Sequence, residues 1–173
     1  MRADARRNRE RIVQVAVGLF AEHGPGVSME EIAQAAGLGV GTLYRHFPDR
    51  RSLLEEISVD TLTRLAAFVR AGAAEDVPRW QVLHEIVRYC VGQPVSLVKS
   101  LPDAPPMSAT RLGLMGEVDE MLARLAEQAQ EEGSLRRDIT PEQVVGLLNV
   151  MLCRPGARED DPLTRVMIEG LRA

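Results

Sequence analysis

The chain has 173 residues, of which 45% are hydrophobic and only 3% aromatic. A chain of this length can bury a substantial core in one or two compact units. With so few aromatic residues, that core must consist mainly of Leu, Val, Ile, Ala and Met, a mixture that favours helices over strands. The formal net charge of −4 argues against a protein that coats nucleic acid without selectivity.

Cysteine usage and hydropathy exclude several other classes. Cys90 and Cys153 lie far apart, and neither belongs to the spacing of a zinc site or a disulfide framework. No uncharged stretch approaches the length of a membrane span. We therefore expect a soluble cytoplasmic protein with no metal, no cofactor and no contact with membranes.

The first third of the chain predicts short helices in close succession. Apolar residues from Ile12 to Phe20 recur at helical spacing, and the pattern ends in the glycine- and proline-containing segment 23–26. Ser28, followed three residues later by a glutamate, indicates the capped start of a second helix that Gly37 ends. Residues 40–47 predict a third helix, and Pro48-Asp49 breaks the chain after it.

The rest of the chain also follows a helical period. A long connecting helix is predicted from Arg50 to about Gly72, followed by helices over residues 80–91, about 95–101, 108–132, 141–152 and 162–171. No segment shows the alternation of a strand. The expected fold is all-α, with about nine helices. It comprises an N-terminal three-helix domain over residues 1–48 and a helical bundle over residues 49–173.

The second and third helices have the plan of a helix-turn-helix, whose second helix lies in the major groove of DNA. Ala33 is small where the two helices cross, Gly37 permits the turn, and Leu43 anchors the second helix. These spacings alone leave open an ordinary helical hairpin.

The segment from Val27 to Leu54, VSMEEIAQAAGLGVGTLYRHFPDRRSLL, resembles the DNA-binding segment of the TetR family of bacterial regulators. The similarity runs from about Arg9 to Leu54, and beyond it the chain resembles the family in being helical and in its closing Glu-Gly-Leu-Arg. The resemblance implies a homodimer with double-stranded operator DNA and a small-molecule effector as partners.

Contacts with DNA are implied for matching positions of the motif. Arg45 is the best candidate for a guanine contact, worth about 1 to 3 kcal/mol of discrimination. Interpretations without a role in DNA binding remain open, because Tyr44 can cover the small core and Arg45 and His46 can be ordinary surface residues. The positions implied in DNA binding are Ser28, Met29, Gly39, Val40, Gly41, Thr42, Tyr44, Arg45, His46 and Arg50.

The sequence departs from the family at Gly39 and Val40, where many relatives have a serine and a basic residue. Residues 1–11 carry five arginines against two carboxylates, a local net charge of +3. We expect this basic segment to replace part of the missing electrostatic attraction to DNA by reaching a minor groove. The alternative is a solvated terminus.

The resemblance also implies a dimer interface formed by the last two helices and an effector pocket among the middle helices. Apolar and aromatic residues at helical spacing are also typical of a monomer core, so that alternative stays open for both sets. The candidates for the interface are Val144, Val145, Leu148, Met151, Leu163, Val166 and Met167. The candidates for the pocket are Trp80, His84, Tyr89, Met107 and Met115.

The predicted function is a DNA-binding repressor that binds a palindromic operator as a dimer and is released by a small-molecule effector. An enzyme is not expected, because the three histidines and two cysteines form no nucleophile–base or metal pattern and no phosphate-binding glycine loop is present. The alternative is a helical protein-interaction module with a degenerate helix-turn-helix, for which Val40 is the support.

Overall fold

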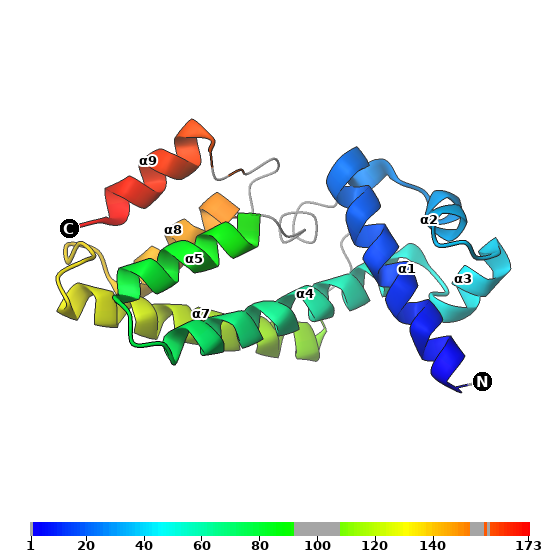
Figure 1. Ribbon diagram of the computed structural model, residues 1–173, viewed down its shortest axis with the longest axis horizontal. Helices are drawn as coiled ribbons and strands as arrows, with labels where there is room; N and C mark the ends of the chain where they lie inside the picture. The colour runs from blue at the N-terminus through cyan, green and yellow to red at the C-terminus, as the bar shows by residue number, and fades with distance from the viewer. Residues whose placement is uncertain (1, 92–107, 153–157, 159) are drawn as a thin grey trace.

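The computed structural model describes residues 2–91, 108–152, 158 and 160–173, and within these ranges the chain is helical (Figure 1). The predicted all-α fold is confirmed. The helix expected at about residues 95–101 lies outside the described residues. The elements are α1 (Arg2–His23), the 3-10 turn η1 (Gly24–Gly26), α2 (Met29–Ala35), α3 (Val40–His46), α4 (Arg50–Ala73), α5 (Arg79–Val91), α7 (Ala109–Glu131), α8 (Pro141–Leu152) and α9 (Pro162–Leu171).

The molecule is elongated, with a head and a body at its two ends (Figure 1). Helices α1, α2 and α3 form the head, and α5, α7, α8 and α9 form the body. Helix α4 runs from the head along the body, where it packs against α7 and α5. The two chain ends therefore lie at opposite ends of the molecule.

Local chemistry fixes where the head helices begin and end. The hydroxyl of Ser28 accepts the backbone N–H of Glu31 at 3.2 Å, which confirms the predicted cap of α2. Gly37 has a φ of +65°, a left-handed conformation that glycine adopts without the steric cost of a side chain. Asp49 caps α4 by accepting the backbone N–H of Ser52 at 2.7 Å.

Two hydrophobic cores hold the molecule together, and α4 contributes to both. The head core unites α1, α2 and α3 with the first turns of α4, and its largest fully buried side chains include Phe47 and Ile12. The body core unites α5, α7, α8 and α9 with later residues of α4 such as Leu65 and Val69. Each fully buried aliphatic or aromatic side chain contributes about 1.5 to 3 kcal/mol relative to an exposed one.

The head core extends past the predicted domain boundary after residue 48. Leu53, Leu54 and Ile57 of α4 are buried in the head core together with Phe47. The boundary itself stays a prediction about how the chain divides.

Close packing of α4 on α5 is concentrated at Gly72. A Cβ atom built on Gly72 lies 2.9 Å from Cγ1 of the buried Val82. The β-branched side chain of Val82 cannot readily change rotamer in a close-packed core. The close approach of α4 to α5 therefore depends on the absence of a side chain at residue 72.

We predict that Gly72→Ala destabilises the protein by about 1 kcal/mol, because overpacking outweighs the gain in helix propensity. Gly113→Ala in α7 is the matched control, since a Cβ there meets nothing within 4 Å. It should stabilise the protein by about 0.5 to 1 kcal/mol. Urea denaturation followed by circular dichroism measures both. Equal stabilisation by the two substitutions would contradict the close packing.

Candidate functional site

Helix α3 presents one face to solvent and the opposite face to the head core. Leu43 is fully buried, whereas Val40, Tyr44 and Arg45 are exposed. Helices α2 and α3 lie at the end of the head farthest from α9 (Figure 1). The exposed face of α3 is therefore free to enter a groove of DNA without a clash from the body.

The side chains on this face have weak partners of their own. The hydroxyl of Tyr44 donates to Glu30 Oε1 at 3.5 Å, a long bond. Arg45 Nη2 donates to Thr42 Oγ1 at 2.9 Å. Both interactions lie at the surface, so bases or phosphates can replace them at little cost in free energy.

Ser28, which the sequence implied in phosphate binding, is engaged within the protein. Its backbone N–H and its hydroxyl each donate to Glu31 Oε2 at 2.7 Å, and these bonds lower the pKa of Glu31. The carboxylate of Glu31 is therefore ionised at neutral pH beside Ser28. A phosphate that approaches Ser28 meets this negative charge.

Arg9 of the basic N-terminal segment fastens α3 to α1 and α4. Its Nη1 donates to the carbonyl of His46 at 2.8 Å, and its Nε and Nη2 donate to the Glu56 carboxylate at 3.1 Å each. Its guanidinium also lies 4.4 Å from the centroid of the Phe47 ring. Arg9 therefore positions the candidate reading helix. Its partners are 37 and 47 residues away in sequence, so no local signal could reveal them.

The basic segment, which was expected to reach a minor groove, is helical from Arg2. Arg6 pairs with Glu10 at 2.8 Å, and Arg7 pairs with Asp4. Among the described contacts Arg11 is exposed and has no ion pair. The net charge of the segment is thus partly neutralised along α1.

Arg50, another predicted phosphate contact, also braces the head. Its Nη1 donates to the carbonyl of Val27, and its guanidinium lies 5.1 Å from the centroid of the Phe20 ring. The side chain holds the segment that leads into α2 against the start of α4.

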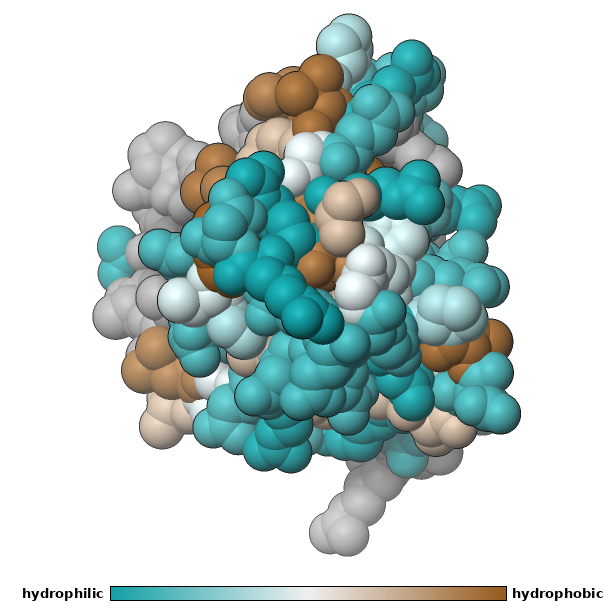
Figure 2. Space-filling model, turned by 90° about the vertical axis from the view of Figure 1, so that its left-hand side faces the viewer, coloured by the Kyte–Doolittle hydropathy of each residue, from teal (hydrophilic) through white to brown (hydrophobic). Residues whose placement is uncertain are grey.

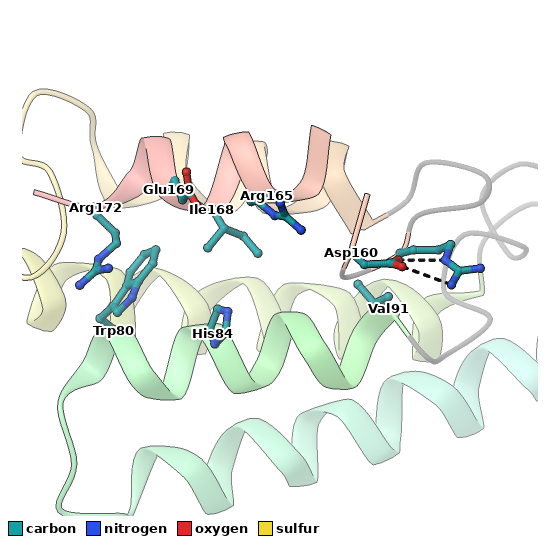
Figure 3. A pocket seen from close by; sticks show the side chains of 9 residues that line it. Trp80, His84, Val91, Asp160, Arg165, Ile168, Glu169 and Arg172 are labelled. Carbon is teal, nitrogen blue, oxygen red and sulfur yellow. Dashed lines mark hydrogen bonds and ion pairs between the residues drawn. The ribbon is translucent and has the colours of Figure 1, made fainter. Parts of the chain in front are cut away.

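The structure divides the predicted effector pocket between separate places. Trp80 and His84 line an open hollow of about 760 Å³ between α5 and α9 (Figure 3). Met115 instead lines a cavity of about 50 Å³ among α4, α5, α7 and α8, with the buried Arg111 in its wall. Tyr89 stacks on Phe68, with ring centroids 4.3 Å apart, and Met107 lies outside the described residues.

The predicted interface residues also separate into two groups. Val144, Val145, Leu148 and Met151 are buried in the protomer's own core, and Met167 is half-buried. The exposed apolar residues of α8 and α9 are Leu163 and Val166, which were predicted, and Leu147 and Val150, which were not; their exposed fractions are 47%, 64%, 40% and 68%. Figure 2, which faces the end of the molecule that holds α9, shows hydrophobic residues at the surface at the top, over this helix.

Two family models match separate parts of the chain. Residues 12–57 match the family model of bacterial regulatory proteins of the tetR family, and residues 80–173 match the C-terminal domain of SbtR-like transcriptional regulators. A solved TetR transcription regulatory protein from Mycobacterium vanbaalenii is 31% identical over 99% of both chains, with a TM-score of 0.68. The chain belongs to the TetR family.

Other TetR-family similarities are more distant or shorter. The solved TetR transcriptional regulator SCO0520 from Streptomyces coelicolor is 27% identical over 95% of this chain and 98% of that one, with a TM-score of 0.64. An HTH-type transcriptional regulator of Staphylococcus aureus strain USA300 is 52% identical over 54 residues. That match covers 31% of this chain and 29% of the relative's length.

In the described ranges no group of three His, Cys, Asp or Glu side chains is placed to hold a metal ion. None of the helices described is both long and apolar enough to cross a membrane.

We predict that Arg9→Met lowers the free energy of unfolding by about 1 kcal/mol, because a half-exposed arginine loses charged hydrogen bonds to α3 and α4. In a protein of this size that change lowers Tm by about 2 to 4 °C. Arg11→Met is the matched control, with an expected effect within about 0.5 kcal/mol. Thermal unfolding followed by circular dichroism compares the two variants. Equal losses of stability would show that the contacts of Arg9 with α3 and α4 do not stabilise the protein.

Proposed function

We propose that the protein is a transcriptional repressor that acts in the bacterial cytoplasm, binds a palindromic operator as a homodimer and is released from it by a small-molecule effector. The observation that carries the proposal is the exposed face of α3, where Tyr44 and Arg45 project from a helix held by the buried Leu43 and Phe47. A rigidly held helix at one end of a molecule meets the geometric need of major-groove reading. Membership of the TetR family supports it.

Arg45 is proposed to read a base, and its neighbours are proposed to contact the DNA backbone. Its hydrogen bond to Thr42 pre-orients the guanidinium on the exposed side of α3. Space around Gly39 and Gly41 is open, since a Cβ on either meets nothing within 4 Å. DNA can therefore approach the start of α3 closely, and phosphate contacts are assigned to Tyr44 and His46. Ser28 and Arg50 are bonded within the head, and the Met29 side chain is buried there.

The dimer is proposed to form through the outer faces of α8 and α9. Leu147, Val150, Leu163 and Val166 are exposed there, and they offer apolar surface that a second copy can cover. A symmetric pair of heads then engages two half-sites about 34 to 36 Å apart or a multiple of that distance. A degenerate helix-turn-helix is not favoured, because α3 retains its exposed Tyr44 and Arg45.

Release by an effector follows from a shift between two dimer arrangements. One arrangement of the dimer places the two heads at the spacing of the half-sites, and the other does not. A ligand that binds more tightly to the second arrangement lowers operator affinity, and the difference between its affinities for the two arrangements sets the size of the effect. The hollow between α5 and α9 is the candidate place for it.

We predict that the purified protein enriches a palindrome from pooled random duplexes through rounds of selection. Arg45→Ala should weaken binding to the selected site by about 10- to 100-fold, which corresponds to about 1 to 3 kcal/mol, and should relax the base preference at one position of each half-site. Arg124→Ala, at an exposed position of α7, is the matched control and should leave affinity unchanged. Failure of the folded parent protein to enrich any sequence would refute the repressor.

For the dimer we predict that Val166→Glu yields monomers and lowers operator affinity, because a charge then enters an apolar interface. Leu112→Glu introduces the same charge at an exposed leucine of α7 and should remain dimeric. Analytical ultracentrifugation distinguishes the two species. A dimeric Val166→Glu variant would place the interface elsewhere.

A further inference from the structure

The hollow between α5 and α9 has the size and chemistry of a small-molecule site. Its volume of about 760 Å³ lies in the range of about 300 to 1,000 Å³ that is usual for ligand pockets. Trp80 and His84 line it from α5, Arg165 and Ile168 line it from α9, and Arg172 lines it from just beyond the end of α9 (Figure 3). The cavity of about 50 Å³ around Met115 is too small for a ligand of that kind.

The rim of the hollow carries two guanidinium groups that form no ion pair with any described residue. Arg172 lies over the Trp80 ring, 5.8 Å from its centroid, and Arg165 lies further along α9. Two carboxylates also line the hollow. Asp160 is already bonded to Arg158 at 3.0 and 3.4 Å, which leaves Glu169 as the one carboxylate of the lining that forms no hydrogen bond or ion pair with a described side chain. The local balance therefore favours an anion, although the whole chain is acidic.

The floor of the hollow is apolar. Trp80, His84 and Ile168 separate it from a small void of about 10 Å³ that core residues such as Leu83 and Val144 line from below. An apolar group laid on this floor covers the Trp80 indole and displaces water from it, which is favourable in proportion to the area buried.

We propose that this hollow binds a small organic carboxylate with an aromatic or branched apolar body. The body lies on Trp80 and Ile168, the carboxylate accepts hydrogen bonds from Arg172, which lies over Trp80, and Arg165 adds positive charge on the other side of Ile168. Arginine suits this role, because its planar guanidinium donates two parallel hydrogen bonds to a carboxylate.

The position of the hollow assigns such a ligand a regulatory effect, and this part rests on the proposed repressor function. Arg165 of α9 and Arg172 just beyond its end line the hollow that faces α5, whereas Leu163 and Val166 are exposed on another side of α9. A carboxylate held between α5 and α9 therefore contacts the helix that is proposed to join the two copies. Its binding biases the arrangement of the dimer and thus operator affinity.

Trp80 is the only tryptophan of the chain, so its fluorescence reports directly on this site. The probes are phenylacetate and its neutral analogue phenylacetamide, titrated into the full chain without DNA. Phenylacetate should change the Trp80 emission in a saturable way and bind about ten-fold more tightly than the amide, because only the acid carries the charge that the arginines recognise.

The double variant Arg165→Gln/Arg172→Gln should abolish this preference, so that acid and amide bind with affinities within about two-fold. Arg124→Gln, at an exposed position of α7 outside the hollow, is the matched control and should keep the preference. Far-ultraviolet circular dichroism verifies that each variant is folded.

Equal binding of acid and amide to the parent protein, or a preference that survives in the double variant, would overturn the proposal. An absence of saturable change in Trp80 emission would overturn it as well. A final titration repeats the acid in the presence of the selected operator. Binding of the acid with no change in operator affinity supports the carboxylate site and overturns only its regulatory effect.

Discussion

The arrangement of the molecule depends on one helix that belongs to two cores. At about 1.5 Å per residue, the 24 residues of α4 span about 36 Å. Leu53 and Ile57 are packed in the head core, and Leu65 and Val69 are packed in the body core. Because both cores are close-packed, neither can release α4 without losing buried apolar area. The direction of the head relative to the body is therefore set by where the body holds α4.

The body holds α4 by polar contacts near the head and by close packing at the far end. Ser108, which caps α7, donates its hydroxyl to Glu55, and Arg111 Nη1 lies 3.7 Å from the same carboxylate. At the other end Gly72 lets α4 approach α5 closely. A buried ion pair contributes little net stability but strongly disfavours arrangements that separate its partners. The first contact thus fixes the register of α4 on α7, and the second fixes its distance from α5.

Local sequence signals predicted most of the helix starts and ends, but they could not predict which side chains of different helices contact one another. The cap at Ser28 and the turn at Gly37 follow from neighbouring residues, so sequence periodicity and capping rules suffice. Arg9 was interpreted as part of a DNA-reaching arm because its charge is visible and its distant partner Glu56 is not. In α8 the helical period identified the apolar residues, but both Val144 and Val150 are apolar and only packing decides that Val144 is buried. The composition of a mainly apolar helix such as α8 does not show which of its sides packs against the core of the protomer.

Helix α9 combines three surfaces in ten residues, which explains why its sequence alone was hard to interpret. Its inner side closes the body core, another side exposes Leu163 and Val166, and a third lines the hollow with Arg165, while Arg172 lines it from just beyond the end of the helix. Both ends are fastened. At the start the Asp161 carboxylate accepts the backbone N–H groups of two α9 residues, and at the end the backbone pairs with the segment that precedes α8 through a single antiparallel bridge. A helix of ten residues keeps its shape through its own backbone hydrogen bonds, so its sides move together when the helix moves. A ligand in the hollow that shifts α9 therefore also moves Leu163 and Val166.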